Sequence, residues 1–204
     1  MTDRPRIILA TQNQDKIREI KHILGSLPVE FLPLNALTGV KPVVEDGATF
    51  EANAIGKARG IWEQTGQACL ADDSGLEVDA LGGEPGVRSA RFAGEEATYE
   101  ANNRKLIRLL KDVAPAERTA RFVCVACLVT TKGKMVVQRG ELDGLIVDQP
   151  RGSGGFGYDP IFYLPRYEKT VAELDAEVKN SISHRAKAFR AMQGFIAALC
   201  SPRS

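Results

Sequence analysis

A polar segment near the N-terminus carries the first group of side chains suited to chemistry. Residues 7–10 form an apolar run typical of a buried strand, and isoleucines then recur at helical spacing. A helix N-terminus offers unpaired N–H groups and a partial positive charge, which favour a phosphate, and Lys16 adds a full charge. Thr11 and Asn13 can donate side-chain hydrogen bonds. The pattern predicts a phosphate-binding loop or, alternatively, an Asn13 or Asp15 that only caps the helix.

Paired carboxylates follow a second apolar run. Asp72 and Asp73 come directly after residues 68–71, and in open α/β sheets sites form outside the carboxyl ends of strands. Adjacent carboxylates repel, so a cation or a proton is expected to separate their roles. Hard oxygen ligands suit Mg²⁺, and Glu45, in an acidic turn before a helix, is a further candidate ligand. The alternatives are an Asx turn with Gly75 at positive φ and, for Glu45, a turn that merely favours the helix dipole.

A third group combines an aromatic side chain with cations. Phe156 lies in a glycine-rich segment, where its ring face can stack on a nucleobase with little obstruction. Lys179, His184 and Arg185 cluster near the start of the last helical pattern, and their N–H groups can donate to keto oxygens. The alternatives are a structural glycine turn and ordinary solvation of a helix end.

The Cys124-x-x-Cys127 pair invites a zinc or redox interpretation, which we reject. The surrounding residues 122–129 form an apolar run typical of a buried strand. Side chains three apart on a strand point to opposite faces, so the two sulfurs cannot grip one metal. We expect small, buried, apolar side chains instead.

The elements that must position these residues alternate between strand and helix. Strands are expected at residues 7–10, 29–32, 68–71, 119–131, 135–138, 145–147 and 161–163. Helices are expected at residues 16–24, from a Thr49 cap to about 65, at 99–111 with Asn102, Leu106, Leu109 and Leu110 on one side, from a Thr170/Glu173 capping box to about 179, and after a Ser183 cap. The order predicts an α/β fold with a mixed sheet.

Composition excludes several other classes of protein. The 204 residues are 44% hydrophobic and 26% charged with a net charge of +1, which is far from the composition of disordered or collagen-like chains. No apolar run approaches a membrane span, and no secretory signal is visible. A cytoplasmic protein of one domain (1–204) is therefore expected. The balanced charge also argues against a nucleic-acid partner.

The motifs, taken in order, resemble one family: the inosine/xanthosine triphosphate pyrophosphatases. The matching segments are 10–16 (ATQNQDK), 71–76 (ADDSGL), 83–86 (GEPG), 89–91 (SAR), 154–162 (GGFGYDPIF) and 181–185 (SISHR). The resemblance implies an elongated mixed β-sheet flanked by helices, with two lobes and a central nucleotide-binding cleft. It also implies a homodimer and a requirement for Mg²⁺. The implied reaction hydrolyses noncanonical purine nucleotides (ITP, dITP, XTP) to the monophosphate and pyrophosphate.

The resemblance also implies a role for individual residues. Glu45 and Asp73 resemble the metal carboxylates, and Asp73 the proton acceptor. The substrate-binding residues that it implies are Thr11, Gln12, Asn13, Gln14, Asp15, Lys16, Ser74, Phe156, Gly157, Tyr158, Asp159, Lys179, His184 and Arg185. Fixed donors would accept a 6-keto purine and reject adenine, whose 6-amino group is itself a donor.

Three other functions remain as alternatives. A related pyrophosphatase of the septum-site Maf type is disfavoured by the Ser-His-Arg segment, residues 183–185. A non-catalytic nucleotide-binding regulator is disfavoured because Lys16, Glu45 and Asp73 are all present. A nucleic-acid-binding module is disfavoured by the net charge and by only 6% aromatic residues.

Overall fold

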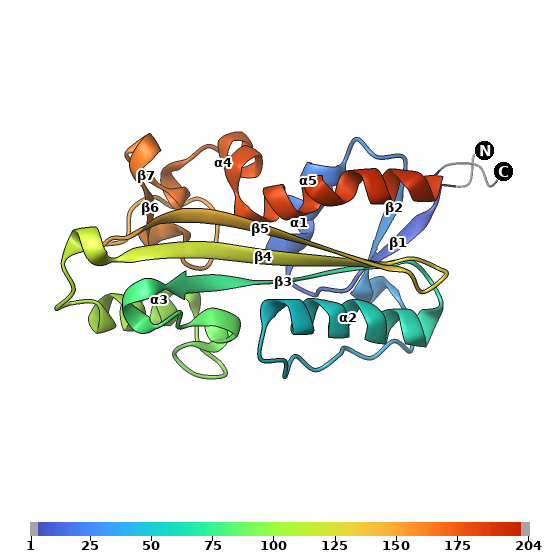
Figure 1. Cartoon of the computed structure of the whole chain (residues 1–204), viewed down its shortest axis with the longest axis horizontal. Coiled ribbons are helices and arrows are strands. Elements are labelled where there is room, and N and C mark those ends of the chain that lie inside the picture. Colours follow the sequence, from blue (N-terminus) through green and yellow to red (C-terminus); the bar gives the residue numbers. More distant parts are fainter. Residues whose placement is uncertain (1–3, 201–204) are drawn as a thin grey trace. The chain divides into compact units, whose positions relative to one another are not determined.

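The computed structural model describes residues 4–200, and in this part the chain forms a seven-stranded sheet of order β2-β1-β3-β4-β5-β6-β7 (Figure 1). The strands are β1 (Arg6–Leu9), β2 (Glu30–Pro33), β3 (Cys69–Val78), β4 (Thr119–Val129), β5 (Met135–Ile146), β6 (Phe162–Leu164) and β7 (Lys169–Thr170). The α-helices are α1 (Gln14–Leu24), α2 (Phe50–Thr65), α3 (Tyr99–Leu109), α4 (Ala176–Ile182) and α5 (His184–Ala197). Strand β1 pairs in parallel with β2 and β3, whereas β6 pairs antiparallel with β5 and β7. The predicted α/β class with a mixed sheet is therefore confirmed.

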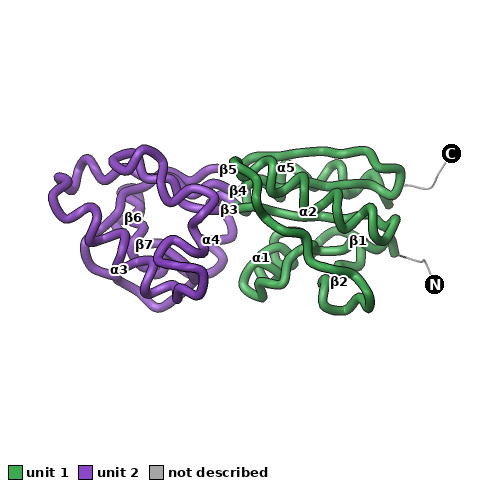
Figure 2. Tube along the Cα trace, turned by 90° about the horizontal axis from the view of Figure 1, so that it is seen from below, with its two compact units in different colours: residues 1–73, 124–140, 185–204 green, residues 74–123, 141–184 purple. Residues whose placement is uncertain are grey.

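The chain divides into two compact units, shown in different colours in Figure 2. Unit 1 contains residues 1–73, 124–140 and 185–204, and unit 2 contains residues 74–123 and 141–184. The boundaries fall inside β3, β4 and β5, so each of these strands contributes to both units. None of the described helices is long and apolar enough to cross a membrane.

Unit 1 has its own hydrophobic core. Helices α1 and α5 cover one face of its strands with residues such as Ile20 and Phe189, which pack against Leu70 and Cys124 of β3 and β4. Helix α2 lies on the other face (Figure 1). Thr49 caps α2 by accepting a hydrogen bond from the amide of Ala52, as predicted.

Unit 2 has a separate core. Leu76, Leu106 and Phe122 belong to it, and the rings of Phe122 and Phe162 stack with centroids 4.3 Å apart. In α3, Asn102 and Leu106 are buried as predicted, but Leu109 is 44% exposed. The predicted buried side of this helix is therefore wrong at Leu109.

Several predicted boundaries are also wrong. Strand β3 does not end at Ala71 but continues through Asp72 and Asp73 to Val78, so Gly75 is a strand residue and not the positive-φ residue of an Asx turn. The two strands expected at 135–138 and 145–147 are one strand, β5. The Thr170/Glu173 capping box exists, but it caps a single 3₁₀ turn, and α4 begins afterwards. The start of the last helix, by contrast, is where it was expected: α5 begins directly after Ser183, which is also the C-cap residue of α4.

Candidate functional site

The loop after β1 is shaped by its own side chains. Asn13 Oδ1 accepts hydrogen bonds from the amides of Asp15 (2.9 Å) and Lys16 (3.1 Å), and Thr11 Oγ1 accepts from the amide of Asn13 (3.2 Å). Asn13 is therefore the N-cap of α1, as one of the two alternatives predicted. Because two amides of the first turn are already used, the positive charge available to a ligand here comes mainly from the Lys16 side chain.

Lys16 belongs to a buried cluster of charges on the α1/α5 face of β3. Its Nζ lies 3.0 Å from Asp72 Oδ2, and Arg185 Nη2 lies 3.6 Å from the same oxygen. Arg185 also pairs with Glu19 of α1, and Cys124 Sγ lies 3.9 Å from Asp72 Oδ2. The side chain of Asp72 is 0% exposed, that of Arg185 2% and that of Lys16 15%. Solvent therefore reaches this cluster through Lys16 and through Glu19, whose side chain is 13% exposed.

The charges of this cluster support one another. Burial alone would lower the pKa of Arg185, but the neighbouring carboxylates of Asp72 and Glu19 raise it above its ordinary value. Two cations and two carboxylates thus balance in a site with little access to water, which is the condition under which buried charges are tolerated.

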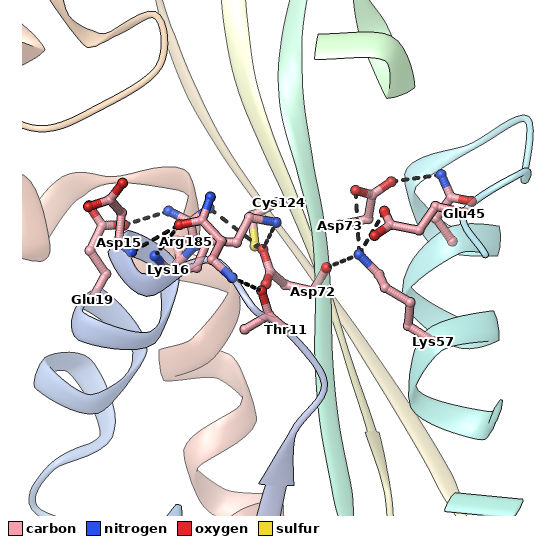
Figure 3. A network of polar contacts seen from close by, with 12 residues as sticks. Thr11, Asp15, Lys16, Glu19, Glu45, Lys57, Asp72, Asp73, Cys124 and Arg185 are labelled. Carbon is pink, nitrogen blue, oxygen red and sulfur yellow. Dashed lines mark hydrogen bonds and ion pairs between the residues drawn. The ribbon is translucent and has the colours of Figure 1, made fainter. Parts of the chain in front are cut away.

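A second group lies on the α2 face of the same strand. Lys57 Nζ donates to Glu45 Oε2 (2.9 Å) and to the carbonyl oxygen of Asp72 (2.6 Å), and lies 3.7 Å from Asp73 Oδ1. Asn53 Nδ2 donates to Asp73 Oδ2 (2.9 Å). Two carboxylates therefore converge on one buried ammonium group, as the dashed contacts in Figure 3 show.

Asp73 is the member of this group with a shifted pKa. Burial raises the pKa of its carboxyl group, although the charges of Lys57 and Lys16 and the hydrogen bond from Asn53 oppose the shift. Glu45 adds a smaller upward contribution to the pKa of Asp73. The result is a carboxyl group that holds a proton more readily than an exposed aspartate does.

The third group lies in unit 2. Asp159 Oδ2 accepts hydrogen bonds from Lys179 Nζ (2.6 Å) and from the amide of Phe156 (2.8 Å), and Lys179 Nζ lies 4.7 Å from the centre of the Phe156 ring. The hydroxyl of Tyr158 donates to the carbonyl of Ser89 (2.9 Å). Three predicted residues, Phe156, Asp159 and Lys179, are thus held together, and Tyr158 is fixed to a different segment.

The remaining predicted residues lie in varied surroundings. His184, in unit 2, is 6% exposed and stacks on Phe122 with ring centroids 4.8 Å apart. Gln12 and Gln14 are exposed, and Gln14 Nε2 donates to the Gln12 carbonyl (3.3 Å). Ser74 is half-buried within β3.

Sequence reasoning missed Asn53, Lys57 and Glu19. A signal for two of them existed: Asn53 and Lys57 lie one turn apart on α2, among the apolar side chains of its buried face. A polar pair on the apolar stripe of a helix needs partners, and here the partners are the carboxylates of Asp73 and Glu45.

The donor set of the α2 face fits Mg²⁺. Among residues 4–200, no group of three or more His, Cys, Asp or Glu side chains is placed to hold a metal ion. Mg²⁺, however, usually takes only one or two carboxylates and leaves its other positions to water and substrate phosphates. Glu45, with a side chain 41% exposed, and Asp73 provide such a pair.

Comparison with known proteins identifies the family. The Ham1 family model matches residues 7–195, and the chain therefore belongs to the Ham1 family. It is 49% identical to the dITP/XTP pyrophosphatase of Desulforamulus reducens (91% of this chain, 92% of the relative) and 51% identical to that of Geobacter sulfurreducens (90% and 92%).

Solved structures agree with this family. The Ham1 protein of Staphylococcus aureus superposes with a TM-score of 0.85 at 41% identity, over 95% of this chain and 99% of the other. That of Coxiella burnetii gives a TM-score of 0.87 at 40% identity, again over 95% and 99%.

Proposed function

We propose that this chain is a Mg²⁺-dependent pyrophosphatase that hydrolyses noncanonical purine nucleoside triphosphates, namely dITP, XTP and ITP, to the monophosphate and pyrophosphate. The observation that carries the proposal is the convergence of Glu45 and Asp73 on Lys57, one strand position away from the Lys16–Asp72 pair. The similarity to two dITP/XTP pyrophosphatases supports the choice of substrate class.

In this proposal Glu45 and Asp73 hold the metal ion. When bound, Mg²⁺ offsets phosphate charge and makes a bound water easier to deprotonate. Asp73 accepts the proton of the water that attacks the α-phosphorus, and its raised pKa suits this role because a general base works best with a pKa close to the working pH. Lys57 keeps both carboxylates in place, and Asn53 fixes the second oxygen of Asp73.

Lys16 binds the oxygens of the departing pyrophosphate. Its side chain is the more exposed of the two cations of the α1/α5-face cluster, at 15% against 2% for Arg185, so an anion can approach it without dismantling the cluster. A positive charge placed where negative charge accumulates lowers the barrier more than it strengthens substrate binding.

Selection of the base rests on donors that meet a 6-keto group. Lys179 Nζ donates to Asp159 and lies 4.7 Å from the centre of the Phe156 ring, and an ammonium group is a donor suited to a keto oxygen. Adenine carries a 6-amino group, so donor would face donor and a buried polar group would lose its partner. Phe156 offers the ring on which the base stacks.

One assay tests the proposal. The purified protein is incubated with ITP, dITP, XTP, GTP, ATP and TTP in the presence of Mg²⁺, and the products are identified. Pyrophosphate with monophosphate from ITP, dITP and XTP is expected, with little turnover of ATP. Orthophosphate with diphosphate would indicate cleavage at a different bond. Preference for a different base would indicate a pyrophosphatase of the Maf type, and binding without turnover would indicate a regulator.

Two further properties belong to the proposal. A homodimer is expected, and light scattering coupled to size-exclusion chromatography distinguishes it from a monomer. A cytoplasmic location is expected because the nucleotide pool is there, and microscopy of a fluorescent fusion tests it.

A further inference from the structure

Helix α3 contacts two consecutive residues of the glycine-rich loop. Tyr99 and Asn103 lie one turn apart on this helix, so their side chains share a face. The ring of Tyr99 lies 6.1 Å from that of Phe156, with the planes inclined at 43°, and Asn103 Nδ2 donates to the carbonyl oxygen of Gly157 (3.1 Å).

The side-chain amide of Asn103 is buried, but among the described residues only its nitrogen has a hydrogen-bond partner. The residue is only 6% exposed, and its Oδ1 is buried without a hydrogen-bond partner in the part of the chain that the structure describes. A buried acceptor without a partner costs stability, and natural proteins contain few of them. The interaction with Gly157 therefore persists at a cost, which favours a functional reason for this residue.

The neighbouring Asn102 differs in both respects. Its Oδ1 accepts from the amide of Ala93 (2.7 Å), and its Nδ2 donates to the carbonyls of Ala90 (3.0 Å) and Ser89 (3.4 Å). Asn102 thus ties α3 to its own preceding segment and is fully satisfied, whereas Asn103 reaches a residue 54 positions away.

The backbone of the loop at Gly157 is held by contacts from other residues. Gly157 has φ +64, a left-handed conformation that glycine adopts readily because it has no Cβ, and it has no side chain of its own to hold its peptide group in place. Asp159 holds the amide of Phe156, and Tyr158 anchors the other side of Gly157 to Ser89. The contact from Asn103 fixes the carbonyl between these two anchors.

We propose that Asn103 and Tyr99 are positioning residues that hold Phe156 and Gly157 in the geometry that recognises a keto purine. The inference rests on the proposed function, because it takes the Phe156–Asp159 loop as the base-binding element. Asn103 sets the direction of the Gly157 peptide, and Tyr99 limits the orientations of the Phe156 ring. Neither residue acts on the phosphates, so their loss should weaken recognition of the base alone.

The test separates the base from the phosphates. Calorimetry measures the affinity for inosine monophosphate and, separately, for inorganic tripolyphosphate, and hydrogen exchange follows the loop amides at residues 154–159. Asn103→Ala is expected to lower the affinity for inosine monophosphate roughly three- to tenfold, the worth of one hydrogen bond, while tripolyphosphate affinity stays within about twofold. Loop exchange should become faster.

Matched variants address folding. Tyr99 is 44% exposed, so Tyr99→Ala should fold normally and still lower the affinity for inosine monophosphate. Tyr99→Phe keeps the ring and should have the wild-type affinity. Asn103→Asp keeps the size but places an oxygen against the Gly157 carbonyl, so it should behave like Asn103→Ala. Glu100→Ala, on the exposed side of the same helix, is the control and should change neither affinity.

Two results would overturn the inference: unchanged loop exchange in both Asn103 variants, or faster exchange with unchanged affinity for inosine monophosphate. An equal loss of affinity for tripolyphosphate would also overturn it, because the variant would then have lost structure in general. A wild-type protein that neither hydrolyses dITP nor binds inosine monophosphate would contradict the proposed function itself, and the inference would fall with it.

Discussion

Asp72 and Asp73 are neighbours in strand β3, and their carboxylates lie on opposite faces of the sheet. Asp72 pairs with Lys16 and Arg185 on the face that α1 and α5 cover, whereas Asp73 meets Lys57 on the α2 face. Successive side chains of a strand alternate in this way, so a dipeptide can supply two unlike carboxylates. We therefore expect the two residues to differ in what their loss does.

Asparagine substitutions should separate chemistry from stability. Asp73→Asn should lower turnover of dITP roughly 10²- to 10⁴-fold, the usual worth of a general base. Its Tm should be equal or higher, because burial raises the pKa of Asp73 and an ionised Asp73 therefore costs stability at neutral pH. Steady-state kinetics and thermal melts on the same preparations measure both effects.

Asp72→Asn is the counterpart. This substitution removes the buried carboxylate that Lys16 and Arg185 share. Breaking a buried ion pair by removing one partner lowers the free energy of unfolding by about 3–5 kcal/mol. Urea denaturation measures this loss. Near-normal turnover by Asp73→Asn, or a melting point for Asp72→Asn like that of the wild type, would contradict these assignments.

Lys57 should control the pH dependence of the reaction. Its charge is the largest influence that lowers the pKa of Asp73, so Lys57→Met should raise that pKa further. The base form of Asp73 would then appear at higher pH, and the acid limb of kcat/KM against pH should move upward. Lys57→Arg, which keeps the charge, is the control and should move this limb less. An unmoved acid limb in Lys57→Met would show that Asp73 is not the group being titrated.

Removal of the metal should stop turnover without unfolding the protein. Chelation with EDTA should abolish hydrolysis and addition of Mg²⁺ restore it, since the two carboxylates otherwise have Lys57 as a counter-charge. Glu45→Gln should raise the Mg²⁺ concentration for half-maximal activity at least about tenfold. Arg59, which pairs with Glu63 on the surface of α2, provides the control Arg59→Gln. Full activity in EDTA would rule out a metal requirement.

The buried cysteines should resist thiol reagents. Burial and the neighbouring Cys127 raise the pKa of Cys69 to about 12, and burial and Glu51 raise the pKa of Cys127 to about 11. The thiolate is the reactive form, so at pH 8 these side chains should react orders of magnitude more slowly than an exposed cysteine. Ellman's reagent should therefore label mainly the half-buried Cys200 in the native protein and all four cysteines in urea. Rapid labelling of Cys69 in the native state would contradict this prediction.

Local signals in the sequence were sufficient for some elements. Helix α2 was predicted with its Thr49 cap and its end before Gly66, because capping and the left-handed glycine are determined within a few residues. The mixed sheet followed from the order of elements. The Phe156–Asp159 loop and Lys179 were singled out, and the structure brings them together in unit 2.

Elements that depend on distant partners were not predictable. The Asp-Asp-Ser-Gly segment resembles a turn, yet it continues β3 because Lys16, Lys57 and Arg185, distant in sequence, neutralise its carboxylates. Strand β5 was split in the prediction, whereas the structure carries it through Gly144, where a Cβ would lie 2.4 Å from Phe162 of β6. A glycine there reflects close packing of strands, which the sequence alone does not reveal.

The interleaving of the two units has a consequence for synthesis on the ribosome. Unit 1 begins with β1 and α1, but Phe189 and Met192 of its core belong to α5, which is synthesised last. Glu19 of α1 likewise pairs with Arg185, which lies 166 residues further along the chain. Unit 2, made of residues 74–123 and 141–184, has all its strands and helices before α5 is made. The core that α1 shares with β3, β4 and α5 is therefore completed only when the last helix has been made, and until then part of its apolar surface is exposed on the nascent chain.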